Sequence, residues 1–256
     1  MRVVGLLLLT LLAACNKQQA LSRLVPPADQ ARAAHYVDLL RARQLDAIEE
    51  AADPSIRTPQ LKANLEQLAT VLPRGTPASA KLVGAQVAAM PEGTRTDVVF
   101  EYEYSRKWFL ANVVTLRKGD AVTLLGLNVR SIPESLEQRH GFGLRGKSAV
   151  HYVVLALAVL FPLLTVYALA ACARTKMRGR KWPWMIFILF GVGTFAINWT
   201  TGDVQIWLLS FQLFSASATA ALYGPWIVSV SLPVGALVFL LRRRALAAVE
   251  SPAPAP

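Results

Sequence analysis

Residues 148–172 read SAVHYVVLALAVLFPLLTVYALAAC, and this stretch decides the class of protein to which the chain belongs. Its 25 residues include no Asp, Glu, Lys or Arg. A helix needs about 20 predominantly apolar residues to cross the hydrocarbon core of a bilayer, so the stretch predicts a membrane-spanning helix. Pro162 is compatible with this prediction, because neighbouring groups inside a membrane protein can satisfy the carbonyl that a proline leaves free.

Two further apolar stretches follow, at residues 182–199 and 222–241. Each has the length and apolar character of a membrane span, and the tryptophans at the ends of the first are placed like an aromatic belt. Residues 204–221 are apolar but interrupted by Gln and Ser side chains, so we expect an interfacial or re-entrant segment there. The sequence thus predicts an all-α membrane domain of three transmembrane helices over residues 148–244.

Basic residues set the expected orientation. Five of them lie between residues 173 and 181 and three at 242–244, and basic loops stay on the cytoplasmic side of a bacterial inner membrane. The polypeptide before residue 148 is then expected in the periplasm, and residues 245–256 are expected to form a disordered cytoplasmic tail. The two clusters also account for most of the net charge of +11, which therefore does not indicate a nucleic-acid partner.

The N-terminus has the layout of a secretory signal, because Arg2 precedes a short apolar run that ends in small residues. The end of this run, Leu12-Ala13-Ala14-Cys15, resembles the lipobox of bacterial lipoproteins. The resemblance implies a signal peptide over residues 1–14, a lipid carrying acyl chains such as palmitate on Cys15, and a lipidated tether over residues 15–28. An uncleaved signal anchor is the alternative.

Residues 29–140 show the patterns of a periplasmic α+β domain. Apolar residues at helical spacing predict two helices, and alternation of apolar and polar residues then predicts four strands. The helices are expected over residues 29–52 and 58–72, and the strands over 81–90, 96–104, 108–116 and 122–132. Two helices followed by a four-stranded antiparallel meander resemble NTF2-like or cystatin-like domains. The similarity is one of fold and implies no particular function.

Glu101 and Glu103 form the one candidate catalytic pair, since both lie on the same face of a predicted strand. Two such carboxylates could carry out acid–base chemistry if that face lined a cleft. The solvated outer face of an antiparallel sheet explains them as well and is the interpretation we favour. The sequence has no nucleophile–base motif, phosphate loop or metal-ligand cluster. We therefore expect no metal and no other cofactor, and favour a non-enzymatic role, with an enzyme as the alternative.

A second candidate site is a polar group at the edge of the predicted membrane domain, made of Asn198, Asp203, Gln205 and Gln212. Asp203 is the only acidic residue between residues 140 and 249. An ionisable residue inside a membrane is a functional candidate by default. At the interface, however, such a residue is readily solvated, and a simple loop position is the plainer explanation for Asp203.

The stretches Asn198-Trp199-Thr200-Thr201-Gly202 and Leu222-Tyr223-Gly224-Pro225-Trp226 are similar to those of a family of uncharacterised bacterial inner-membrane proteins. The resemblance implies a place in the cell envelope and no known activity. We expect a non-enzymatic envelope lipoprotein whose periplasmic domain binds an unknown ligand or partner and whose membrane domain anchors it or docks to other membrane proteins. Its expected partners are membrane lipids and a membrane or periplasmic protein. A small oligomeric transporter or channel component and a periplasmic enzyme are the alternatives.

Overall fold

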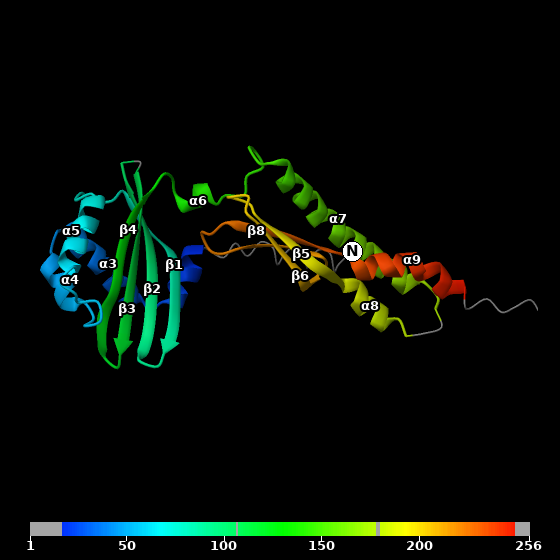
Figure 1. The fold of residues 1–256 in the computed structure, drawn as a ribbon, viewed down its shortest axis with the longest axis horizontal. Helices are drawn as coiled ribbons and strands as arrows, with labels where there is room; N and C mark the ends of the chain where they lie inside the picture. The colour runs from blue at the N-terminus through cyan, green and yellow to red at the C-terminus, as the bar shows by residue number, and fades with distance from the viewer. Residues whose placement is uncertain (1–16, 106, 178–179, 249–256) are drawn as a thin grey trace, which may run out of the picture. The chain divides into compact units, whose positions relative to one another are not determined.

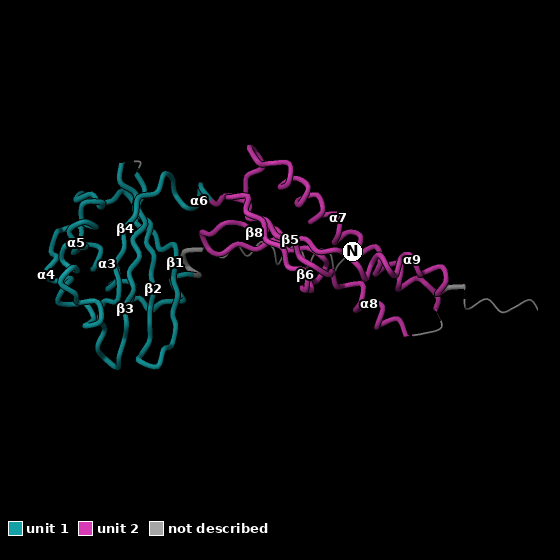
Figure 2. Tube along the Cα trace, viewed as in Figure 1, with its two compact units in different colours: residues 1–139 teal, residues 140–256 magenta. Residues whose placement is uncertain are grey.

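The computed structural model describes residues 17–105, 107–177 and 180–248. The chain divides into two compact units, unit 1 within Met1–Arg139 and unit 2 within His140–Pro256 (Figure 2). The predicted signal peptide and the predicted lipidation site, Cys15, lie outside the described residues. Residues 249–256 of the predicted tail lie outside them too.

Unit 1 is a four-stranded antiparallel sheet with helices α3, α4 and α5 against one face (Figure 1). In chain order its elements are α2 (Lys17–Leu24), α3 (Pro27–Arg41), α4 (Leu45–Ala51), α5 (Leu61–Val71), β1 (Ser79–Met90), β2 (Gly93–Tyr104), β3 (Lys107–Lys118), β4 (Ala121–Ile132) and α6 (Leu136–Arg139). The strands pair in the order β1-β2-β3-β4, so the predicted meander is present. Helix α3 packs on β2 and β3, and helices α4 and α5 pack on β4.

The single helix predicted over residues 29–52 is two helices in the structure, α3 and α4. The break falls at Arg43, whose φ of 61° lies in the left-handed region. A residue in that region cannot continue a right-handed helix, so the chain turns there. Leu40 before the turn and Ile48 after it are both fully buried. Apolar spacing therefore continues across the break, and the pattern alone does not reveal the turn.

Alternation along β2 separates the two faces of the sheet. Val98, Phe100 and Tyr102 are at most 8% exposed and form part of the core beneath the helices. The residues between them, among them Val99 and Glu101, point to the opposite face because successive side chains of a strand alternate. Helices α3, α4 and α5 thus cover one face of the sheet.

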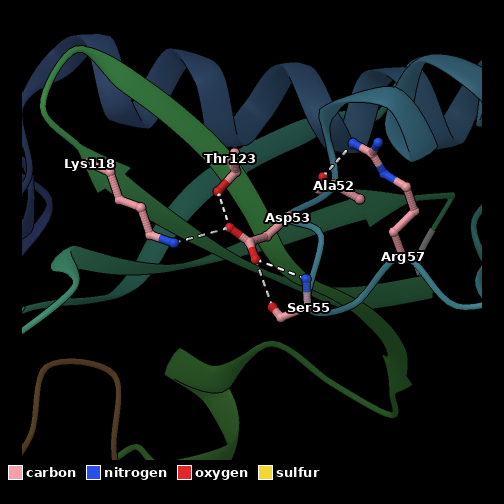
Figure 3. A network of polar contacts seen from close by, with 6 residues as sticks. All are labelled: Ala52, Asp53, Ser55, Arg57, Lys118 and Thr123. Carbon is pink, nitrogen blue, oxygen red and sulfur yellow. Dashed lines mark hydrogen bonds and ion pairs between the residues drawn. The ribbon is translucent and has the colours of Figure 1, made fainter.

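The connection between α4 and α5 runs along the edge of β4 (Figure 3). Ala52 forms an isolated parallel bridge with Leu124, and the backbone N–H of Asp53 donates to the carbonyl of Leu124 at 2.8 Å. Arg57 reaches back and donates to the carbonyl of Ala52 at 2.9 Å. These contacts tie the helical layer to the edge strand through the backbone.

The carboxylate of Asp53 reinforces this tie (Figure 3). It accepts hydrogen bonds from the backbone N–H of Ser55 at 3.0 Å, from the Ser55 hydroxyl at 2.8 Å and from the Thr123 hydroxyl at 2.9 Å. The ammonium group of Lys118 lies 3.7 Å away. Hydrogen bonds to Ser55 and Thr123, more than the charge of Lys118, lower the pKa of Asp53 to about 2.

Replacing Asp53 by asparagine should make the thermal unfolding midpoint depend less on pH in the acidic range. The folded pKa, about 2, is below the ordinary value of 3.8, so the ionised carboxylate stabilises the fold above about pH 4. That contribution is lost as the pH falls through the folded pKa. Asp53→Asn should therefore lower the thermal unfolding midpoint at pH 7 and leave it little changed near pH 2. Asp120→Asn, at an exposed turn, should leave the profile unaltered; equal effects of the two substitutions would contradict this role of Asp53.

Unit 2 combines helices with a second four-stranded antiparallel sheet (Figure 1). Its elements are α7 (Ala149–Arg174), α8 (Trp182–Leu189), β5 (Phe190–Asn198), β6 (Val204–Leu213), β7 (Ala216–Ala220), β8 (Trp226–Leu232) and α9 (Val234–Ala248). The strands lie in the order β6-β5-β8-β7, so β5 pairs with β8 although β6 and β7 lie between them in the chain.

Helix α7 is the single helix among the described residues that is long and apolar enough to cross a membrane. It has 26 residues, and most of its apolar side chains are not covered by the rest of the protein. Leu160 is 56% exposed and Leu163 is 62% exposed. By length and composition, α7 is therefore able to cross a bilayer.

Two buried clusters hold unit 2 together. The first joins α7 to the sheet and includes Val154, Trp199 and Val228. The second lies where α7, α8 and α9 meet and includes Cys172 and Phe239, both fully buried. One end of α7 thus packs on strands and the other end on helices.

The prediction of three transmembrane helices is wrong. The stretch 182–199 forms the short helix α8 and then strand β5, and the stretch 222–241 forms a turn, strand β8 and the start of α9. Gly193 has a φ of +69°, which ends any helix there, and Pro233 separates β8 from α9. Counting apolar residues over 18 to 20 positions does not register these breaks, because hydropathy carries no information on backbone conformation.

The segment 204–221, expected to be interfacial or re-entrant, forms strands β6 and β7. Polar residues interrupt its apolar run, and Leu213 and Ala216 mark the end of one strand and the start of the next. At the C-terminus α9 continues to Ala248, so the first residues of the predicted tail are helical. The described part of unit 2 is therefore α+β, with one helix that could span a membrane.

Candidate functional site

The face of the unit 1 sheet that lies opposite α3 is the first candidate binding surface. Strand pairing places two rows of side chains on it. In one row Leu110 of β3 lies between Glu101 of β2 and Arg130 of β4, and in the other Asn112 lies between Val99 and Asn128. We call this surface the open face and define it by these six residues: Val99, Glu101, Leu110, Asn112, Asn128 and Arg130.

Five of the six residues surround a hollow of about 270 Å³. This is close to the lower end of the range for small-ligand pockets, about 300–1,000 Å³. Arg130 and Asn128 are exposed at its rim, and Asn112 is partly buried. The side-chain oxygen Oδ1 of Asn112 is buried and has no hydrogen-bond partner among the described residues. Buried polar atoms almost always have a partner, so this oxygen is a candidate acceptor for a ligand.

The strand register shifts once in each of the two outer strand pairs of this sheet. The register shifts between Leu82 and Gly84 where β1 meets β2, and between Val114 and Thr115 where β3 meets β4. A bulge inserts an extra residue, which kinks its strand and increases the local twist. The open face is therefore framed by irregular strands on both sides of the central pair.

Glu101 and Glu103 share the same side of β2, as their spacing predicts. Glu101 is only 2% exposed, and its Oε2 accepts a hydrogen bond of 2.6 Å from the backbone N–H of Leu136, the first residue of α6. Glu103 accepts a hydrogen bond of 3.2 Å from the Ser79 hydroxyl. The carboxylate of Glu101 thus binds the start of α6 and is covered, an arrangement that positions the helix.

The polar group predicted at the membrane edge is divided in the structure. Asn198 is the last residue of β5, and Asp203 lies in the turn between β5 and β6. The side-chain oxygen of Asn198 accepts hydrogen bonds from the backbone N–H groups of Thr200 at 2.9 Å and Thr201 at 3.2 Å. Asp203 accepts a hydrogen bond of 2.6 Å from the Thr201 hydroxyl. Both side chains thus stabilise the turn itself.

Gln205 and Gln212 lie farther along β6. Gln205 is exposed and pairs with Ala196, whereas Gln212 lies near the other end of the strand. The amide of Gln212 donates to the hydroxyls of Ser217 and Ser229, both at 2.8 Å. The four predicted residues therefore do not converge on one site.

The turn between β5 and β6 is instead built around Trp199, which is 1% exposed. Its ring stacks on Phe142 with centroids 4.6 Å apart and meets the edge of His151 at 5.2 Å. The indole N–H donates to the carbonyl of Gly143 at 2.8 Å, and Lys147 donates to the carbonyl of Trp199. These contacts fix the segment that precedes α7 onto the turn.

The three polar residues at the hollow, Asn112, Asn128 and Arg130, were not singled out by the sequence. Asn112 and Asn128 become neighbours only through the register of β3 with β4, which no pattern along one strand specifies. The available signal was weak: polar residues at alternate positions 128 and 130. No group of three or more His, Cys, Asp or Glu side chains in the described ranges could hold a metal ion.

Comparison with known proteins adds no relative. No protein family matches the chain, and neither a curated protein nor a solved structure matches it. The similarity of unit 1 to NTF2-like or cystatin-like domains, and that of unit 2 to an uncharacterised inner-membrane family, stay predictions from the sequence.

Proposed function

We propose that this chain is a non-enzymatic, membrane-anchored protein of the bacterial cell envelope that binds a ligand or partner through the open face of unit 1. Helix α7 supplies the anchor, because it has the length and the uncovered apolar side chains of a membrane span. The basic clusters after α7 and within α9 favour a cytoplasmic position for those ends, and hence a periplasmic position for unit 1.

Two observations carry the binding function: the hollow beside Arg130, and the buried, unpartnered Oδ1 of Asn112, a residue that lines this hollow. A ligand that satisfies both groups offers a hydrogen-bond donor to Asn112 and a carboxylate or carbonyl oxygen to Arg130. A peptide segment offers both within a few ångströms. The exposed amide of Asn128 supplies a further donor and acceptor at the rim. We therefore propose a peptide segment of a protein partner as the ligand.

The proposal is tested by photo-cross-linking in living cells. A photo-reactive phenylalanine analogue in place of Asn128 should give a discrete cross-linked species on irradiation, because this residue lines the rim. Adding Arg130→Gln should weaken binding about ten- to a hundredfold and reduce the cross-linked fraction, since a hydrogen bond to a charged group contributes about 1.5–3 kcal/mol. The fraction is measured on immunoblots of the full-length chain.

The analogue at Asp120, in the exposed turn after β3, is the matched control. It should give no discrete species, because the turn lies outside the hollow. Equal cross-linking from both positions, or a species at Asn128 that persists undiminished with Arg130→Gln, would refute binding at the open face.

A further inference from the structure

Three arginines meet in one pocket of unit 2. The pocket, of about 360 Å³, lies between the C-terminal part of α7 and the C-terminal part of α9. Its polar lining consists of Tyr167, Arg174, Thr175, Arg243 and Arg244, and its apolar lining of two alanines of α7. We call it the arginine pocket.

The charge in the arginine pocket is not neutralised by the part of the chain that the structure describes. Among the described residues no acidic side chain lines it, and none of its three arginines forms an ion pair with one of them. Asp203, the only acidic residue between 140 and 249, belongs to the turn between β5 and β6. Three arginines line one cavity, and their positive charges repel one another, so the arrangement favours a bound anion.

We propose that the arginine pocket binds a phosphate group. Guanidinium groups match the geometry of phosphate oxygens through paired N–H donors. Arg243 donates to the Tyr167 hydroxyl at 3.4 Å, which leaves the hydroxyl hydrogen of Tyr167 free to donate to an anion. The C-terminal end of α7 carries about half a negative charge, which the three whole positive charges of the arginines outweigh.

The position of the pocket favours the phosphodiester of an anionic lipid headgroup over free phosphate as the source of that group. The pocket lies at one end of α7, the helix that could span a membrane, and this step rests on the proposed membrane anchor. Leu241, just before the arginines of α9, is 82% exposed and offers an apolar surface to acyl chains. Basic pockets at the cytoplasmic ends of membrane helices suit anionic headgroups for this reason.

Native mass spectrometry of the full chain in mild detergent tests the proposal with three probes: phosphatidylglycerol, phosphatidylcholine and inorganic phosphate. Phosphatidylglycerol should bind wild type in preference to phosphatidylcholine, whose choline group compensates the phosphate charge. The triple variant Arg174→Gln, Arg243→Gln, Arg244→Gln should bind phosphatidylglycerol about a hundredfold more weakly, from the contribution of each arginine near an anionic headgroup.

A second triple variant, Lys176→Gln, Arg180→Gln, Arg242→Gln, removes the same charge from residues of the same two segments that do not line the pocket. It should keep the wild-type affinity. Equal loss in both triple variants, or equal binding of the two lipids, would overturn the proposal. Circular dichroism of both variants checks that the helices are retained.

The phosphate arm separates the two sources of the anion. Free phosphate is the ligand if inorganic phosphate displaces phosphatidylglycerol from wild type, binds wild type in the absence of lipid, and binds the pocket variant about a hundredfold more weakly. Phosphate that neither binds nor competes assigns the site to the lipid headgroup. Membrane attachment is measured separately, by alkaline extraction. If the arginine pocket does not bind phosphatidylglycerol but the chain still resists extraction, the proposed anchor is retained and only the pocket proposal is refuted.

Discussion

Two arginines placed on the outward side of α7, Leu160→Arg with Leu163→Arg, should release the chain from the membrane fraction. Each arginine near the centre of a membrane helix costs about 2.5–3.5 kcal/mol of insertion free energy, so the pair shifts the insertion equilibrium by about four orders of magnitude. In a soluble protein the same two positions would face water, since the leucines are 56% and 62% exposed, and arginine there would be tolerated. The measurement is the fraction of chain that resists alkaline extraction from membranes.

The matched control places the same side chain at exposed apolar positions of unit 1, Leu24→Arg with Val87→Arg. These residues are 56% and 45% exposed, comparable with the leucines of α7. Attachment to the membrane should be unchanged, because neither belongs to a span. If the α7 variant stays in the membrane fraction as fully as this control, α7 does not lie in the bilayer.

Replacing Gly235 by alanine should disrupt the junction between α8 and α9. A Cβ atom at this position would lie 1.8 Å from the carbonyl oxygen of Phe187 and 2.5 Å from its carbonyl carbon. Both are backbone atoms, so the clash is relieved only if the two helices separate. Small residues permit such close approach of helices inside membranes, and overpacking costs about 1–3 kcal/mol or more. We expect a lower thermal unfolding midpoint for unit 2 in detergent.

Gly143→Ala is the control for this substitution. A Cβ atom there would meet nothing within 4 Å, and the backbone of Gly143 is not in the left-handed region. The midpoint should stay at the wild-type value or rise slightly, because alanine restricts the unfolded chain. A Gly235→Ala protein as stable as Gly143→Ala would show that the helices accommodate a methyl group at their contact.

Elements whose pattern is local were predictable from the sequence. The length of the apolar stretch and its lack of charge predict helix α7. Alternation of apolar and polar residues, between turns such as Lys118-Gly119-Asp120, predicts the meander of unit 1. The turn at Arg43 was not predicted, because the packing on either side of a non-glycine residue, and not its own type, imposes a left-handed φ.

The prediction of transmembrane helices after α7 is wrong because hydropathy measures how apolar a stretch is and not the period at which its polar residues recur. Residues Trp226–Leu232 contain a serine at alternate positions, Ser229 and Ser231, and this period of two is the signature of strand β8. The signal was present, but the apolar length of the surrounding stretch outweighed it. A strand buried between neighbours and a membrane helix are both apolar, and only length and breaks such as Gly193 separate them.

The candidate sites were less accessible to prediction than the fold. Asn112 and Arg130 are on different strands, and the hollow between them depends on the pairing of β3 with β4. The sequence shows the arginines of the pocket as members of two basic clusters, which predict the orientation of the chain in the membrane. Their meeting requires α7 and α9 to pack side by side, a tertiary contact that no local pattern contains.

The strand order of unit 2 also determines when its sheet can form during synthesis on the ribosome. The sheet of unit 1 pairs only consecutive strands, so it can be completed as soon as Ile132 has emerged. Strand β5 instead pairs with β8, for example Val192 with Leu232. At a synthesis rate of about 5–20 residues per second, β5 waits on the order of a few seconds for its central neighbour. Throughout that interval Val154 of α7 is already made, while Val228, which joins it in the finished cluster, is not.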